Sequence, residues 1–283
     1  IDISSFDCPS VGSNTVILTS TAVNADAGTC TSTVTVEDNV SPDALCQDIT
    51  VQLDAAGSAT ITDTDIDAGS SDACGLSSVS IDITSFDCTS VGPQTVTLTL
   101  EDNNTNVSTC TSVVTVEDNV APIAICLDIP VDLDVNGMAT ITSGDIDGGS
   151  TDACGIASTT LDITSFDCSA VGPNTVTLTV TDANGNVSTC TSTVTVSDAI
   201  NSVALCQDIT VQLDATGSAT IVASDVDGGS TDACGPLTLS IDISSFDCSS
   251  VGPNMVTLTA TDVNGNAGTC TSTVTVEDNV SPD

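Results

Sequence analysis

The sequence predicts an all-β protein made of tandem β-sandwich repeats of 80 residues, and two observations carry this prediction. Cysteines recur at a spacing of 80 residues, as at Cys46, Cys126 and Cys206, and a fixed period indicates tandem structural units. Runs in which Thr alternates with Val or Leu, such as residues 95–100, are separated by Gly, Pro and Asn. This pattern is typical of short strands with one buried face, joined by turns.

The phase of the repeat divides the chain into one half repeat and three full repeats. The full repeats are residues 41–120, 121–200 and 201–280. Residues 1–40 correspond to 81–120 and form the C-terminal half of a repeat, and residues 281–283 begin another. Half a repeat should not close a sandwich, so we expect residues 1–40 to pack on a preceding segment or to borrow strands from another chain. We also expect the chain to be a window from a longer array.

Each repeat is expected to contain five strands, because five segments rich in Val, Thr and Ile alternate with turn residues. In the first full repeat these strands are 49–54, 58–61, 76–83, 95–100 and 111–117. Between them lie turns at 55–57 and 91–93, an acidic loop at 63–75 and a loop at 103–106. No segment shows the period of an amphipathic helix. The recurrent phenylalanines Phe6, Phe86, Phe166 and Phe246 are expected to fill the cores.

The charge balance excludes several classes of function. The 283 residues include 39 Asp and Glu but no Lys, Arg or His, for a formal charge of −39. Such a chain has no basic surface for nucleic acid or for an anionic membrane. It also lacks the His of a catalytic triad and the Lys of Schiff-base chemistry. We therefore predict that the protein is not an enzyme, and we assign no catalytic residue.

The cysteines indicate where the protein resides. Fourteen Cys without CxxC pairs or His are read as disulfides rather than as zinc ligands, which indicates an oxidising compartment outside the cytosol. No run of 18 apolar residues is present, so we predict no direct membrane insertion. The expected localisation is extracellular or on the cell surface.

The segment from Thr175 to Val196 resembles the second half of a hyalin (HYR) repeat, and the next repeat matches it again. The matching residues are Asp182, Gly185, Asn186, Cys190, Val194 and Val196, with Asp262, Gly265, Asn266, Cys270, Val274 and Val276. The first full repeat departs from the pattern at Thr105, where Gly is expected, and the half repeat departs at Ala22, Ala25 and Asp26. The resemblance covers essentially the whole chain.

The hyalin-repeat resemblance implies an immunoglobulin-like β-sandwich in an extracellular protein, and it implies no particular activity. The added Asp-Ala-Cys-Gly and Ser-Phe-Asp-Cys motifs resemble a variant found in large secreted proteins of Bacteroidetes. The chain is therefore read as tandem immunoglobulin-like repeats with two disulfides each.

The disulfide pairing follows from the implied fold. In an immunoglobulin-like sandwich the first and last strands run parallel along one edge, and hyalin repeats usually carry only the bond at that edge. This predicts Cys46–Cys110, Cys126–Cys190 and Cys206–Cys270. By subtraction, the remaining pairs are Cys74–Cys88, Cys154–Cys168 and Cys234–Cys248, which leaves Cys8 and Cys30 without partners. The alternative of 46–74 and 88–110, with 8–30, remains open.

Acidic groups recur in three places and suggest a site for a hard cation such as Ca²⁺, which prefers oxygen ligands. We expect the loops at the top of one repeat to meet the junction that leaves the previous repeat. The candidate ligands are Glu117, Asp118, Asp145, Asp147, Asp152, Asp182, Asn184, Asn186, Asp225, Asp227, Asp232, Asp262, Asn264 and Asn266. No loop has the Glu at position 12 of an EF-hand. The alternative is that these acids are solvated surface charge.

The function that these features favour is structural. Disulfide-crosslinked repeats without trypsin sites would form the shaft of an extracellular filament or cell-surface stalk, stiffened by calcium. The expected partners are neighbouring repeats or further copies of the same protein, with no nucleic acid. The alternative is a calcium-dependent adhesin whose repeats bind a glycan or protein.

Overall fold

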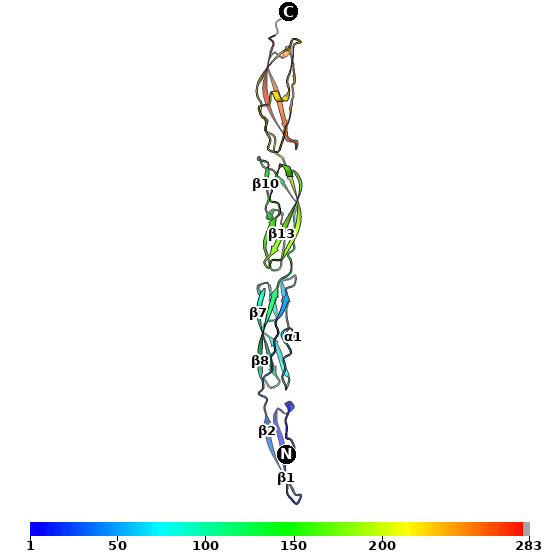
Figure 1. Ribbon diagram of the computed structural model, residues 1–283, viewed down its shortest axis with the longest axis vertical. Coiled ribbons are helices and arrows are strands. Elements are labelled where there is room, and N and C mark those ends of the chain that lie inside the picture. Colours follow the sequence, from blue (N-terminus) through cyan, green and yellow to red (C-terminus); the bar gives the residue numbers. More distant parts are fainter. Residues whose placement is uncertain (280–283) are drawn as a thin grey trace. The chain divides into compact units, whose positions relative to one another are not determined.

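The computed structural model describes residues 1–279, and it confirms an all-β chain of tandem β-sandwich repeats of about 80 residues (Figure 1). The described chain divides into two compact units. The first comprises Ile1–Ala121 together with two loops of the following repeat, Asp152–Gly155 and Ala183–Asn186, and the second comprises the rest. The predicted start of a further repeat at residues 281–283 lies outside the described residues.

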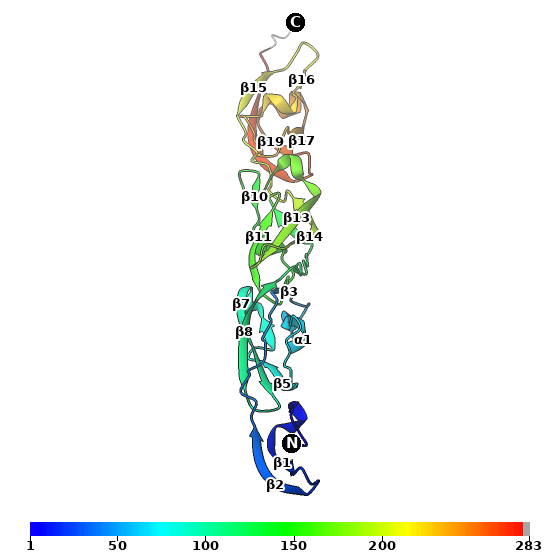
Figure 2. The same cartoon turned by 60° about the horizontal axis from the view of Figure 1, so that its bottom comes forward.

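The first unit contains a hairpin followed by one sandwich. The hairpin is β1 (Gly12–Thr21) and β2 (Ala27–Val36), paired antiparallel (Figure 2). The strands of the sandwich are β3 (Ile49–Gln52), β4 (Ser58–Thr60), β5 (Leu76–Ile81), β6 (Ser85–Asp87), β7 (Gly92–Asp102) and β8 (Val107–Glu117). One-turn helices lie at Cys8–Ser10, α1 (Asp63–Ile66) and Cys88–Ser90.

The second unit repeats this order twice. Its strands are β9 (Ile129–Asp132), β10 (Met138–Thr140), β11 (Ile156–Leu161), β12 (Ser165–Asp167), β13 (Gly172–Asp182) and β14 (Val187–Ser197), then β15 (Ile209–Gln212), β16 (Ser218–Thr220), β17 (Thr238–Ile241), β18 (Ser245–Asp247), β19 (Gly252–Thr261) and β20 (Ala267–Glu277). Its one-turn helices are α2 (Ser143–Ile146), Cys168–Ala170, Ala223–Asp225 and Cys248–Ser250.

Each sandwich has one large and one small layer. In the first, a four-stranded sheet has the order β3-β8-β7-β5, and β4 pairs with β6 in a two-stranded sheet. The first strand, β3, runs parallel to the last, β8, with Ile49 opposite Val114, as the implied fold predicts. The long hairpin β7–β8 is antiparallel, with Leu98 opposite Cys110. The other two sandwiches have the same order of strands.

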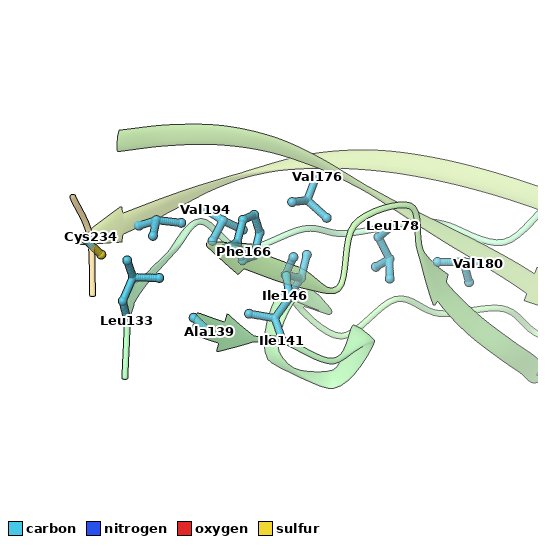
Figure 3. Packing of buried hydrophobic residues seen from close by; sticks show 11 residues of the cluster. Leu133, Ala139, Ile141, Ile146, Phe166, Val176, Leu178, Val180, Val194 and Cys234 are labelled. Atoms are coloured by element: carbon cyan, nitrogen blue, oxygen red, sulfur yellow. The ribbon is translucent and has the colours of Figure 1, made fainter. Parts of the chain in front are cut away.

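The alternating Thr and Val or Leu residues place their apolar side chains in the core. Along β7 the side chains of Val96, Leu98 and Leu100 are completely buried, and burial of such a side chain stabilises the fold by about 1.5–3 kcal/mol. The cluster of the middle repeat contains the equivalent Val176, Leu178 and Val180 (Figure 3). The hairpin strands β7 and β8 are longer than the predicted 95–100 and 111–117, because their pairing continues beyond the alternating run at both ends of β7 and at the start of β8. The strands β3, β4 and β5 are shorter than predicted.

The phenylalanines of the three full repeats lie in these cores, as predicted. Phe86, Phe166 and Phe246 are each 4% exposed. Phe86 lies on β6, a strand that we did not predict, opposite Ala59 of β4. The pattern missed β6 because it is only three residues long, and it missed α1 because one helical turn has no period to detect. The chain begins α1 with Thr62, whose N–H and hydroxyl both donate to Asp65 Oδ2 at 2.7 and 2.8 Å.

The disulfides confirm one half of the predicted pairing and correct the other. The pairs 46–110, 126–190 and 206–270 are present. The predicted pairs 74–88, 154–168 and 234–248, and the open alternative, are wrong. The structure instead joins Cys8 to Cys74, Cys88 to Cys154 and Cys168 to Cys234, so each bond ties one repeat to the next. Among the described residues, Cys30 and Cys248 carry no disulfide.

The reason for this correction is the direction of β5. Leu76, at its start, lies opposite Asp102 at the end of β7, and Asn103 donates to the carbonyl of Cys74 at 2.9 Å. Ile81, at its end, lies opposite Leu98, closer to the start of β7. The strand therefore carries the chain from one end of the sandwich towards the other, and Cys74 and Cys88 cannot meet. Subtraction failed because it assumed that both bonds close within one repeat.

A tight turn makes room for the bond between repeats. Gly57 has φ +73°, and a Cβ at this position would lie 2.7 Å from Cys88 Sγ and 3.2 Å from the Cβ of Ala153. The β3–β4 turn therefore needs glycine twice, for its backbone conformation and for the space that the disulfide occupies. In the middle repeat, Cys234 of the next repeat lies beside Leu133 and Val194 at one end of the core (Figure 3).

Candidate functional site at the repeat junctions

The residues that follow β8 form the centre of the candidate site. Asp118 is 7% exposed, and its Oδ1 accepts a hydrogen bond from the N–H of Val120 at 3.0 Å. Its Oδ2 is buried and has no hydrogen-bond partner among the described residues. Leaving a buried polar atom unpaired costs about 1–3 kcal/mol. The buried oxygen of Asp118 therefore needs an explanation.

A loop of the next repeat brings a second carboxylate to Asp118. One oxygen of Asp152 lies within 4.8 Å of an oxygen of Asp118 and of Cys154 Sγ. All three residues belong to the first compact unit. The loop is held in two ways: the N–H of Cys154 donates to Asp152 Oδ1 at 2.7 Å, and the Cys88–Cys154 disulfide ties it to the preceding repeat. Because Cys154 is oxidised, its sulfur is no thiolate ligand, and only the carboxylates count.

The turn between β13 and β14 holds the other side of the junction. The side-chain amide of Asn186 donates to the backbone carbonyls of Asp118 at 3.0 Å and Val120 at 3.3 Å. The side-chain N–H groups of Asn186 thus hold residues 118–120 of the linker by hydrogen bonds. The equivalent Asn106 and Asn266 donate to the carbonyls of Asp38 and Asp198, at 3.1 and 3.0 Å.

The same arrangement occurs at the two other junctions, with one difference. Asp38 lies near Asp72, and Asp198 lies near Asp232. Asp38 also has a buried Oδ2 without a hydrogen-bond partner among the described residues, although its side chain is less buried than that of Asp118. At the third junction the side-chain amide of Asn264 donates to Asp198 Oδ2 at 2.8 Å. That oxygen is therefore satisfied by the protein itself.

The electrostatics of the junction favour a cation. The two carboxylates lie within 4.8 Å of each other, and two like unit charges at that distance repel by roughly 3–4 kcal/mol at an effective dielectric constant of about 20. The chain contains no Lys, Arg or His to offset them. Carboxylate oxygens are the ligands of hard cations, and Ca²⁺ takes six to eight oxygens. Two carboxylates are a minimal set, which is typical of weak sites in extracellular modules.

The predicted ligands in the acidic loop are used mostly for local turns. Asp145 Oδ2 accepts from the N–H and hydroxyl of Thr142, both at 2.7 Å, and Asp147 Oδ1 accepts from the N–H of Ser150 at 2.8 Å. The hydrogen bonds from Thr142 and from Ser150 lower the pKa values of Asp145 and Asp147, respectively. The equivalents Asp225 and Asp227 accept from Val222 and Ser230 in the same way. These four residues therefore stabilise the loop.

The predicted ligands of the β-hairpin turn are also held internally. In the third full repeat, Asp262 accepts from the N–H groups of Asn264 and Asn266 at 2.9 and 2.8 Å. Burial raises the pKa of Asp262, but the hydrogen bonds, led by the side chain of Asn266, outweigh burial and leave it below the ordinary value. Asp182 is buried at the equivalent position, with Asn184 in the same turn.

Glu117 points to a different partner. Its Oε2 accepts from the side-chain amides of Gln52 at 2.7 Å and Asn119 at 3.3 Å. Of the predicted ligands, then, the structure places Asp118 and Asp152 together in one cluster, and Asp232 in the equivalent cluster with Asp198. The three copies of this acidic pair are completed by Asp38, Asp72 and Asp198. Each lies 80 residues from Asp118 or Asp152, so the period of the repeat could have identified them.

Within residues 1–279, no helix has both the length and the apolar character needed to cross a membrane.

No protein-family model and no curated protein sequence matches this chain. Among solved structures, it is similar to extracellular cadherin domains 1–4 of protocadherin gamma B7, with 13% identity over 95% of this chain and 84% of that chain and a TM-score of 0.35. It is also similar to an I-band fragment of titin, with 10% identity over 85% of this chain and 100% of that chain and a TM-score of 0.39. TM-scores below 0.5 support no inference about function.

Proposed function

We propose that the chain is a load-bearing segment of an extracellular protein, the shaft of a filament or cell-surface stalk. One observation carries this proposal: the disulfides between repeats form a continuous covalent route. The route crosses from Cys8 to Cys74, follows the chain to Cys88, crosses to Cys154, follows the chain to Cys168 and crosses to Cys234. We call this route the disulfide path.

The disulfide path limits how far the chain can be stretched. It uses only the residues from 74 to 88 in one repeat and from 154 to 168 in the next, 14 positions each. Fully extended, 14 residues span about 46–50 Å. The eleven residues of β7 already span about 37 Å as a strand. Even complete unfolding would therefore lengthen each of these two repeats by only on the order of 10 Å, whereas 80 uncrosslinked residues extend to about 260–290 Å.

The composition supports an extracellular setting for this role. Disulfides persist in oxidising compartments, and six are present in the described residues. The absence of Lys and Arg removes every trypsin site. We assign the repeats to the hyalin type, in the variant form seen in Bacteroidetes, on the strength of their sequence motifs. In this role the repeats are non-enzymatic, associate with neighbouring repeats or further copies of the chain, and use Ca²⁺ at their junctions.

The test is single-molecule stretching of the chain between terminal tags that do not use cysteine. In the oxidised protein the two spans inside the disulfide path, 74–88 and 154–168, should each lengthen by no more than about 15 Å, whereas full reduction should release further steps of hundreds of ångströms. The repeat that follows Cys234 lies outside the path, because Cys248 carries no disulfide, and should give one longer step in both states. The proposal would be contradicted if the two spans inside the path already gave long steps in the oxidised protein, or if reduction released no additional long steps.

A matched pair of variants separates the disulfide path from crosslinking in general. Replacing Cys88 and Cys154 by Ala opens the path and should lengthen the oxidised chain by on the order of 150 Å. Replacing Cys46 and Cys110 by Ala removes a loop of similar size but leaves the path closed, so the limit should not change. The measurement depends only on covalent connectivity, so it is valid even for a variant that folds poorly.

A further inference from the structure

We propose that Asp118 and Asp152 together bind one divalent cation of the calcium class at the junction in the first compact unit, and that the Asp198–Asp232 junction does without one. This inference deepens the calcium part of the proposed function. The limit on extension depends only on the disulfides, so the two proposals can fail separately.

The first argument is the state of the Asp118 carboxylate. Its side chain is more than nine-tenths buried, and Oδ2 meets no donor among the described residues. An oxygen of Asp152 lies within 4.8 Å of this carboxylate. Two ionised carboxylates at this separation disfavour each other unless an opposite charge is shared. A cation between them satisfies the unpaired oxygen and offsets both charges.

The second argument is an internal comparison between junctions. At the third junction Asp198 and Asp232 are also close, but the side-chain amide of Asn264 donates to Asp198 Oδ2 at 2.8 Å. At that junction an amide N–H group places a partial positive charge beside the carboxylate oxygen of Asp198. Asp118 Oδ2 has no such donor among the described residues. The equivalent carboxylate oxygen thus accepts a hydrogen bond from the protein at the third junction and has no donor from the described part of the chain at the Asp118 junction. Asp118 Oδ2 therefore needs a partner from outside the protein. Asp38 Oδ2 is open in the same way, but its side chain is less buried, so we place the ion at Asp118 and Asp152.

The third argument is that the junction is already ordered around this position. The Asp118 and Val120 carbonyls are held by Asn186, and the Asp152 loop is held by the Cys88–Cys154 disulfide. Ion binding therefore requires little further ordering of the protein. With two carboxylate ligands, the remaining positions on the ion fall to backbone carbonyls or water, as in weak extracellular calcium sites with Kd near 0.1–1 mM.

The experiment is calcium titration of the full chain in about 150 mM NaCl, which screens diffuse attraction to the acidic surface. Calorimetry should show a saturable site in the wild type. Asp118→Asn and Asp152→Asn should each weaken that site at least tenfold, and Asp198→Asn should leave it unchanged. Absence of a saturable site, or equal losses from Asp118→Asn and Asp198→Asn, would overturn the proposal.

Thermal unfolding supplies a second readout that does not depend on calorimetry. In a chelator, Asp118→Asn should unfold at a higher temperature than the wild type, because it removes the repulsion with Asp152. In saturating CaCl₂ the wild type should gain stability by mass action, and the variant should not. If Asp118→Asn lowers the unfolding temperature equally with and without calcium, the residue is only structural and the proposal is wrong.

Discussion

Cys88 and Cys154 are bonded across a repeat boundary, with their Cα atoms 5.1 Å apart and a sequence separation of 66. Cys88 follows β6 of one repeat, and Cys154 lies in the loop before β11 of the next. The equivalent pairs Cys8–Cys74 and Cys168–Cys234 have the same Cα separation and the same spacing. The repeats are therefore joined by a second covalent connection in addition to the backbone.

This pairing predicts the products of a non-reducing digest. Cleavage before aspartate separates the peptides 87–101, 152–161 and 72–81, each with one cysteine. We expect peptide 87–101 to be linked to 152–161 in the mass spectrum. A link between 87–101 and 72–81 would restore the local pairing instead. The Cys46–Cys110 link, between peptides 43–47 and 102–117, serves as the internal control.

Equivalent leucines in the half repeat and in a full repeat should differ in their contribution to stability. Leu98 is fully buried, whereas Leu18, at the same position of the hairpin β1–β2, is 53% exposed. We expect Leu98→Ala to lower the unfolding free energy of its repeat by about 2–5 kcal/mol, because it leaves a cavity. Leu18→Ala should cost well under about 1 kcal/mol. Hydrogen exchange of β7 and β1 amides measures both effects, and equal losses would contradict the exposed state of Leu18.

A pair of glycines provides a test of close packing at the third junction. A Cβ on Gly268 would clash with the backbone carbonyl oxygen of Ser202, whereas a Cβ on the equivalent Gly28 would meet no atom within 4 Å. We expect Gly268→Ala to destabilise its repeat by about 1–3 kcal/mol, because β20 must move away from this segment. Gly28→Ala should be neutral within about 0.5 kcal/mol. Urea unfolding distinguishes the two variants, and a neutral Gly268→Ala would show that the segment yields easily.

The hairpin turns should make the fold sensitive to acid. Burial raises the pKa of Asp102, but hydrogen bonds, led by that from the Asn106 side chain at 2.7 Å, outweigh it, so the pKa lies below its ordinary value. The ionised carboxylate therefore stabilises the fold above about pH 4, and this contribution declines as pH falls from there through the lower folded-state pKa.

The matched variant is Asp102→Asn, which keeps the shape of the side chain but cannot titrate. It should be less stable than the wild type by a constant margin between about pH 5 and 7, and the margin should shrink below about pH 4. Urea midpoints across this range measure the margin. A margin that stays unchanged down to pH 2 would exclude a role for the ionised carboxylate.

Much of the fold was predictable from the sequence because it depends on local pattern. The alternation along β7 and β8 shows which face of the strand each side chain lies on. The 80-residue period and the turn residues between strands can likewise be read from the order of the residues alone. Pairing at the sandwich edge, as in Cys46–Cys110, followed from the parallel first and last strands. The short elements β6 and α1 were missed because a single turn or three residues carry no period.

The candidate site could be predicted only in outline. The sequence indicated that acids of one repeat meet the junction from the previous one, and the structure places Asp118 and Asp152 together there. It could not show that Asp145 and Asp147 are used in their own loop. Nor could it show that Asn264 satisfies Asp198, while Asp118 Oδ2 is left open.

By itself, then, the sequence determined the repeat, the longer strands, the core residues and the acidic character of the junctions. Only the tertiary structure decided which cysteines pair and which carboxylates face each other. The physical reason is that β5 carries the chain from one end of the sandwich towards the other, so Cys74 and Cys88, close in sequence, are brought to different junctions. Contacts between repeats depend on where each strand ends in space, and residue spacing does not contain that information.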